Sequence, residues 1–192
     1  MLTKNWRKMI DRKQAFVLIN KYLKDKDNIR RGLAVEAILK KMAELLEKDI
    51  QLWGLTGLLH NLDYEYCSSS PEKRGTLSSQ LLEGLLPDGG VNAIKSNNYM
   101  HTDYIPTTSL DKSLIASVSA AGLISVIVRT SDSKTIKDIS LATVVNKYHD
   151  PEFATRYNRK RIILCEDVGM QLEFFLNLCL EEMKEISDEL NF

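Results

Sequence analysis

The sequence is poor in cysteine, glycine and proline, and each shortage excludes a class of protein. Its 192 residues contain three cysteines, nine glycines and four prolines. So little glycine and proline argues against an all-β fold with many turns. Cys67, Cys165 and Cys179 are odd in number and share no CxxC spacing, which favours reduced thiols over a disulfide framework or a zinc site. These thiols are typical of a cytoplasmic protein.

An excess of charge of either sign is also missing. Lys and Arg together number 26, as do Asp and Glu, so the formal net charge is zero. Such a balance argues against a nucleic-acid coat or a polybasic membrane binder. No run of about 18 uninterrupted apolar residues predicts a membrane span, and no apolar run follows the N-terminal cations as in a secretion signal. We therefore expect a cytoplasmic protein that binds neither nucleic acid nor membrane.

Apolar spacing predicts an all-α protein, with residues 1–192 forming a single domain. In the segment 31–47, Val35, Ile38 and Met42 recur at steps of three and four, which is typical of a helix. Asp49 is a candidate N-cap for an apolar helix over 50–60. Other helical patterns cover 6–23, 91–101, 110–128, 136–149, 152–166 and 170–188, and 73–86 is weakly amphipathic. We expect turns at 67–71, 87–90 and 131–134, while 125–130 fits either helix or strand.

Several polar residues lie on the predicted buried faces. Arg31 lies at the start of a core stripe, where its stem can pack while its head reaches water. His60 ends the apolar helix just before Asn61, Asp63 and Glu65. A histidine followed by acids suits a divalent metal, but a lone histidine is more often a core residue with its hydrogen bonds satisfied. Both interpretations stay open from the residues alone.

Other polar positions carry less information by themselves. Asn97 and His101 share a helix face, where an amide either holds a ligand or ends the helix. Arg74 by itself indicates a surface charge, and Val118 indicates core. The sequence lacks the phosphate-binding GxGxxG and GxxxxGK[ST] patterns, the HExxH zinc motif and the GxSxG nucleophile elbow. Its residues alone predict a helical domain with a polar pocket around His60.

Longer segments resemble the small HD-domain (HDIG-type) metal-dependent phosphohydrolases. The resemblance runs from about residue 12 to residue 184, in the family's order and at its separations. The segments that carry it are GLAVEAILKKMAE at 32–44, LWGLTGLLHNLDYEY at 52–66, AIKSNNY at 93–99, PTTSLDKSLIASVSAAGLI at 106–124 and FATRYNRKRIIL at 153–164. This resemblance implies a single-domain HD-fold helical bundle.

The resemblance also implies where a metal site would lie. Active members hold divalent metal with a histidine, a His-Asp doublet and a later aspartate, often helped by two more histidines, and the metal makes hydroxide from bound water. Of the six positions, His60 alone keeps the family residue. Asn61 stands where the doublet has Asp, and Val118 stands where the last Asp would be. The other three positions, which are histidines in the family, hold Arg31, Arg74 and Asn97, and Ser119 replaces an acid that usually follows the last Asp.

These substitutions predict that the metal site is lost. Arginine keeps its proton and offers a metal no lone pair, valine offers nothing, and an amide oxygen is a weak ligand. One imidazole does not hold a catalytic metal, which needs about three or four good donors. We therefore expect a degenerate, catalytically inactive member with no metal and no other cofactor.

Two hypotheses describe what replaces the metal. In the first, Arg31 and Arg74 fill the former cavity and pair with Asp63, Glu36 or Glu65, since a buried cation without a partner would cost roughly 3–5 kcal/mol. In the second, the arginines face an open pocket and bind a phosphate or carboxylate through bidentate hydrogen bonds.

Alternative functions stay open. One is an active phosphohydrolase with a site rebuilt from His60, Asp63 and His101. The other is a protein-interaction module, whose candidate face includes Phe174, Phe175 and Leu176, although burial of these side chains is the simpler expectation. A phosphate-containing small molecule is the candidate partner, and a homo-oligomer is compatible with the sequence.

Overall fold

Side-chain caps set the starts of several helices in the computed structural model, which describes residues 9–192. Asp11 accepts a hydrogen bond from the amide of Gln14 at 2.8 Å, and Asp49 accepts one from the amide of Leu52 at 2.9 Å. This part of the chain forms ten α-helices and no strand: α1 (Arg12–Tyr22), α2 (Lys26–Leu45), α3 (Ile50–Leu59), α4 (Thr76–Leu82), α5 (Asp88–Ser96), α6 (Ser109–Thr130), α7 (Leu141–His149), α8 (Arg159–Ile162), α9 (Leu172–Glu185) and α10 (Ser187–Leu190). The all-α prediction is confirmed.

Some predicted boundaries are wrong, for local reasons. The segment PDGG at 87–90 is not a turn, because Pro87 is the N-cap of α5 and the helix begins at Asp88. The pattern over 31–47 begins earlier, at Lys26, where Asp25 caps the first turn. Residues 152–158 form turns rather than the start of a helix, and a 3₁₀ segment, Ile163–Val168, follows α8. Residues 125–130 are helical, within α6. The predicted helix over 6–23 begins at Arg12, and its first residues, 6–8, lie outside the described residues.

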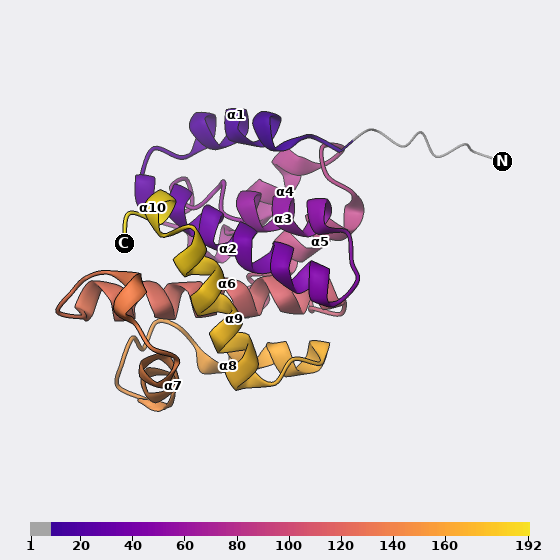
Figure 1. Ribbon diagram of the computed structural model, residues 1–192. Coiled ribbons are helices and arrows are strands. Elements are labelled where there is room, and N and C mark those ends of the chain that lie inside the picture. Colours follow the sequence, from indigo (N-terminus) through magenta and orange to yellow (C-terminus); the bar gives the residue numbers. More distant parts are fainter. Residues whose placement is uncertain (1–8) are drawn as a thin grey trace.

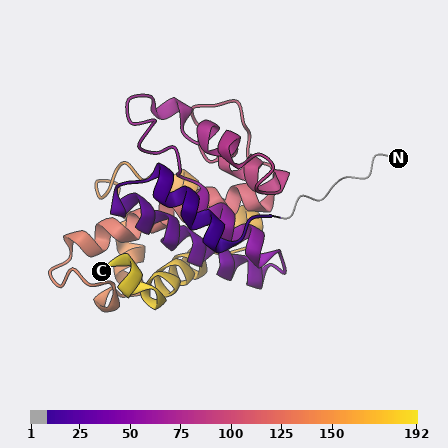
Figure 2. The same cartoon turned by 90° about the horizontal axis from the view of Figure 1, so that it is seen from above.

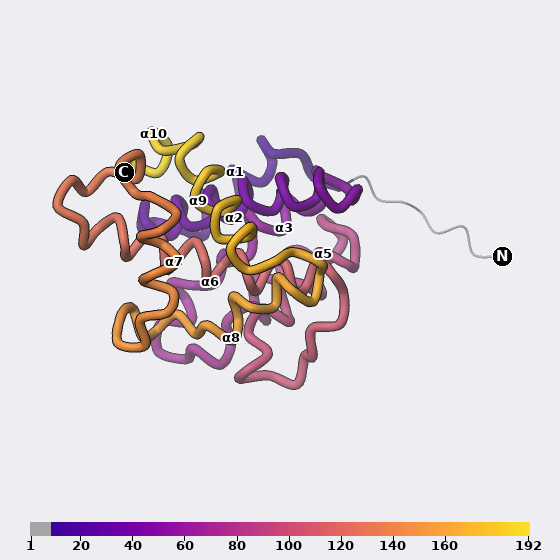
Figure 3. The backbone as a smooth tube through the Cα atoms, turned by 60° about the horizontal axis from the view of Figure 1, so that its bottom comes forward, coloured from indigo at the N-terminus to yellow at the C-terminus, as the bar shows by residue number. Residues whose placement is uncertain are grey.

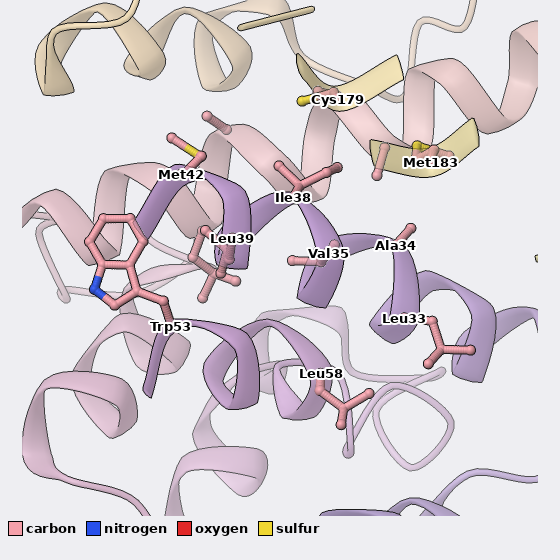
Figure 4. Close-up of a cluster of buried hydrophobic side chains, with 14 of the residues drawn as sticks. Leu33, Ala34, Val35, Ile38, Leu39, Met42, Trp53, Leu58, Cys179 and Met183 are labelled. Carbon is pink, nitrogen blue, oxygen red and sulfur yellow. The ribbon is translucent and has the colours of Figure 1, made fainter. Parts of the chain in front are cut away.

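Helix α2 lies at the centre of the fold and packs against α3, α6 and α9. Its apolar stripe includes Val35, Ile38 and Met42, all fully buried. Figure 4 shows this stripe between Trp53 and Leu58 of α3 on one side and Cys179 and Met183 of α9 on the other. The spacing read from the sequence therefore corresponds to the main core of the domain.

The backbones of α2 and α3 approach each other closely because two glycines face the contact. A Cβ atom on Gly32 would lie 2.7 Å from the carbonyl oxygen of Leu58, and one on Gly57 would lie 2.7 Å from that of Val35. Any side chain at either position would push the helices apart. This contact places the start of α2, with Arg31, beside the end of α3, with His60 and Asn61.

The remaining helices surround this pair. Figure 1 shows α1 along the top of the molecule and α6 passing behind α2. In Figure 2, α4 and α5 lie on one side of α2, and α9 and α10 lie on the other. The backbone tube in Figure 3 leads from α7 into α8, which packs against α6. This path brings residues 156–161 next to the middle of α6.

Helix α6 is long and apolar because it is a core helix. By length and composition alone it is the one helix in residues 9–192 able to cross a membrane, but 72% of its most apolar stretch is buried among the other helices. Burial inside the fold therefore accounts for the apolar composition of α6. In α9, Phe175 and Leu176 are buried as expected, whereas the side chain of Phe174 is 52% exposed.

Candidate functional site

One cleft, with a volume of about 620 Å³, brings together residues from six parts of the described chain. Arg31 comes from α2, and His60 and Asn61 directly follow α3. Arg74 follows a 3₁₀ turn (Pro71–Lys73). The six positions singled out from the sequence all line this cleft: Arg31, His60, Asn61, Arg74, Asn97 and Val118. Asp63 and His101, proposed as parts of a rebuilt site, line it too, as do Tyr64 and Ser119.

Asp63 holds the loop that carries Arg74. Its carboxylate oxygen Oδ2 accepts hydrogen bonds from the amides of Gly75, at 2.8 Å, and Ser78, at 3.0 Å. Gly75 has a φ of +82° and lies so close to α5 that an added Cβ would be 2.6 Å from the carbonyl oxygen of Ile94. The buried carboxylate of Asp63 is therefore a loop anchor, and its Oδ2 atom is already occupied.

The ring of His60 has a defined tautomer. Its Nδ1 atom lies 2.7 Å from the carbonyl oxygen of Gly57. Because a carbonyl only accepts, Nδ1 carries the proton and Nε2 keeps its lone pair. Burial, together with the positive charges of Arg31 and Arg161, lowers the pKa of His60 to about 4, although the bond to Gly57 opposes this shift. The ring is thus neutral at pH 7.

Asn61 is held in one orientation by its amide nitrogen. Nδ2 donates to the carbonyl oxygen of Asn28 at 2.8 Å, so the oxygen Oδ1 points the other way. Oδ1 is fully buried and has no hydrogen-bond partner within residues 9–192. His60 and Asn61 therefore present two neutral acceptors, one on each residue.

The predicted ion pairs of Arg31 and Arg74 are wrong. Glu36 instead accepts from Arg12, at 2.8 Å, and from Lys40, at 2.6 Å. Glu65 accepts from the backbone amides of residues 24 and 25 and from the side chain of Asn28. Asp63, the third predicted partner, serves as the loop anchor described above. In the described part of the chain, neither arginine forms a salt bridge.

The two arginines lie against one tyrosine instead. The guanidinium carbon of Arg31 is 4.9 Å from the ring centroid of Tyr64, and that of Arg74 is 4.2 Å from it. Such cation–π contacts contribute roughly 0.5–2 kcal/mol each but neutralise no charge. Partial burial acts to raise the pKa of Tyr64, but the charges of Arg31, Arg74 and Arg156 outweigh it and lower the pKa overall. The Nε–H group of Arg74 is buried and has no partner among the described residues.

Sequence reasoning missed Arg161, the residue that fills part of the cleft. Its Nε atom donates to the hydroxyl of Ser119 at 2.9 Å, while Nη1 and Nη2 donate at 2.8 Å to the backbone and side-chain oxygens of Asn97. One guanidinium thus joins Asn97 and Ser119, the positions that the sequence resemblance assigns to a histidine and an acid. Burial lowers the pKa of Arg161, which faces no carboxylate in the described residues. The one available signal was the basic run NRKR at 158–161.

Arg156 also lines the cleft, at its exposed edge. Together with Arg31 and Tyr157 it also lines an adjoining cavity of about 450 Å³. Tyr99 does not line the cleft, but its ring centroid lies 5.8 Å from the guanidinium carbon of Arg161. Among the described residues, four arginines and a single carboxylate, that of Asp63, therefore line the cleft.

The side chains that line the cleft do not supply the ligands that a divalent metal needs. Within residues 9–192, no group of three or more His, Cys, Asp or Glu side chains is placed to hold one. His60 offers one lone pair, one carboxylate oxygen of Asp63 is taken by backbone amides, and His101 lies exposed at the edge of the cleft. The surrounding guanidinium groups would also repel a cation. The arrangement is suited to an anion.

Comparison of the chain with models of protein families, with curated proteins and with solved structures gave no match.

Proposed function

We propose that this chain is a degenerate HD-fold protein that has lost metal-dependent hydrolysis and binds a phosphate-bearing small molecule in its cleft. Support for the HD fold comes from the six positions that the family resemblance specifies. They span residues 31 to 118, yet they line one cleft. Support for the loss of hydrolysis comes from the donor set, which retains one imidazole and lacks the two metal-binding aspartates.

The observation that carries the binding proposal is the pair Arg31 and Arg74. Both lie in the cleft, both lack a carboxylate partner among the described residues, and one has a buried donor with no acceptor. Leaving such donors and charges unpaired costs free energy, and an oxyanion would recover it. Guanidinium groups bind phosphate through two parallel N–H donors, which favours this class of ligand.

Calorimetric titration with pyrophosphate at pH 7 tests this proposal. We expect saturable binding that weakens about tenfold or more in each of Arg31→Gln and Arg74→Gln, because a charge-assisted hydrogen bond contributes roughly 1.5–3 kcal/mol. Lys13→Ala is the matched control, since it removes an exposed positive charge on α1, away from the cleft. Equal binding by all four proteins, or none, would contradict the proposal.

The alternatives make different predictions in the same protein. An active phosphohydrolase would release phosphate from phosphomonoesters with Mn²⁺, Mg²⁺, Co²⁺ or Ni²⁺, and would lose this turnover in His60→Ala. A protein-interaction module would use an exposed apolar face. Phe174 offers a single exposed ring on α9, while its neighbours Phe175 and Leu176 are buried.

A further inference from the structure

The cleft contains two neutral hydrogen-bond acceptors that an anion does not satisfy. His60 Nε2 keeps its lone pair and has no hydrogen-bond partner among residues 9–192. The neighbouring Asn61 is 4% exposed, and its Oδ1 atom likewise lacks a partner in the described residues. Both residues line the cleft with the arginines. Oδ1 of Asn61 is buried, whereas Nε2 of His60 faces the cleft, so a bound ligand that carries a hydrogen-bond donor can satisfy Nε2.

Neither acceptor can change its role to suit an anion. Rotating the Asn61 amide would place Oδ1 against the carbonyl oxygen of Asn28, and moving the His60 proton to Nε2 would leave Nδ1 facing that of Gly57. Protonating the ring is disfavoured by burial and by nearby arginines. A fully ionised phosphate oxygen next to these atoms would therefore meet lone pairs, which repel it.

We infer that the cleft recognises a hydroxylated phosphate ester, whose phosphate pairs with Arg31 and Arg74 while a hydroxyl on its organic part donates to His60 Nε2. This inference rests on the proposed function and adds the chemistry of the rest of the ligand. A cleft of about 620 Å³ has room for more than a phosphate group, and Arg31 and Tyr157 also line a neighbouring cavity of about 450 Å³. His60 is thus a specificity-determining residue.

A matched pair of ligands tests the inference. Glycerol 3-phosphate and propyl phosphate carry the same charge on chains of three carbons and differ in two hydroxyl groups. We expect glycerol 3-phosphate to bind about fivefold to tenfold more tightly at pH 7, because its hydroxyl donates to Nε2, whereas the alkyl chain of propyl phosphate displaces water from this atom and offers it no donor. Calorimetry measures both dissociation constants on the full chain.

Two variants test which residue causes the preference for glycerol 3-phosphate over propyl phosphate. His60→Asn keeps a donor near the Nδ1 position for Gly57 but removes Nε2, so we expect it to abolish the preference while propyl phosphate binds as before. Arg74→Gln weakens both ligands equally. As a readout that needs no variant, the ¹⁵N resonance of unprotonated Nε2 shifts on binding glycerol 3-phosphate and not on binding propyl phosphate.

The outcomes separate this inference from the proposed function. If neither phosphate ester nor pyrophosphate binds, both are overturned. If anions bind through Arg31 and Arg74 but the two esters bind equally, or the preference survives in His60→Asn, the hydroxyl inference alone is overturned.

Discussion

Single side chains determine what the cleft can bind. Arginine in place of histidine keeps a nitrogen-rich side chain in the same space, but it exchanges a lone pair for a permanent positive charge and several donors. Asparagine in place of aspartate removes a negative charge from the same shape. Under the HD relationship that we propose, these exchanges at Arg31, Arg74 and Asn61 turn a site suited to cations into one suited to anions.

His60 makes the stability of the chain depend on pH. Its pKa is about 4 in the folded protein, below the ordinary value of 6.5, so between these values the unfolded chain binds the additional proton. Stability from this residue is therefore complete above pH 6.5 and is lost as pH falls toward 4. We expect a loss of roughly 2 kcal/mol between pH 6.5 and pH 5, since each unit is worth about 1.4 kcal/mol.

Urea unfolding of the chain and of His60→Asn at both pH values measures this loss. At each pH, the free energy of unfolding of His60→Asn is subtracted from that of the unchanged chain. This subtraction removes the contribution of the carboxylates, because both proteins contain them. The variant should lose about 2 kcal/mol less than the chain itself on acidification. Parallel losses in the two proteins would show that His60 titrates normally in the folded state.

Helices bring these side chains together through close backbone contacts. The α2–α3 contact lets Arg31 face His60 and Asn61, and Asp63 draws in the loop that carries Arg74. Arg159 plays a comparable part for the segment with Arg156, since its guanidinium donates to the carbonyl oxygens of residues 147, 148, 150, 153, 154 and 157. Asn158 caps α8, since its side-chain oxygen accepts a hydrogen bond from the amide of Lys160 at 2.9 Å.

Substitution of Gly32 tests the close backbone contact between α2 and α3. In Gly32→Ala the new Cβ would lie 2.7 Å from the carbonyl oxygen of Leu58, so the helices must separate, and we expect a loss of about 2 kcal/mol in the free energy of unfolding. Gly89→Ala in α5 is the control, because an added Cβ there meets no atom within 4 Å. That variant should be neutral or more stable by up to about 1 kcal/mol. Urea unfolding measures both, and equal stability of the two variants would contradict the close contact.

At the scale of the molecule, the charges are unevenly distributed even though the net charge is zero. The chain has a net charge of zero, yet four arginines and one carboxylate line the main cleft, while acids such as Glu36 and Glu65 are paired elsewhere. A net charge describes the far field of a protein and says little about one concave site. Anion binding is therefore compatible with a chain that carries no overall positive charge.

Metal ions should leave the stability of the whole molecule unchanged. A ligand that binds the folded state raises the unfolding temperature, and the donor set offers a divalent cation too few lone pairs to bind. We expect dialysis against EDTA, or addition of millimolar Mn²⁺, Mg²⁺, Co²⁺ or Ni²⁺, to shift the thermal midpoint by less than about 1 °C. Pyrophosphate serves as the positive control. Stoichiometric metal in chelator-free preparations would contradict the loss of the site.

Much of the fold followed from local patterns in the sequence. Apolar spacing in α2 predicted which face is buried, because a helix repeats every 3.6 residues whatever surrounds it. The N-cap at Asp49 was likewise local. The prediction of a turn at PDGG was wrong: a proline and two glycines are typical of a turn, but proline also starts helices, and α5 packs against α3, α4 and α6.

The sequence by itself also determined which residues are available to the cleft, since the family resemblance specified six positions that line it. Only the tertiary structure decided how they are used. It assigned Glu36, Glu65 and Asp63 to partners other than Arg31 and Arg74, and it brought Arg161 to the positions of Asn97 and Ser119. Hydrogen bonds and ion pairs depend on distances of about 3 Å between residues far apart in the chain, and no local pattern in the sequence encodes such distances.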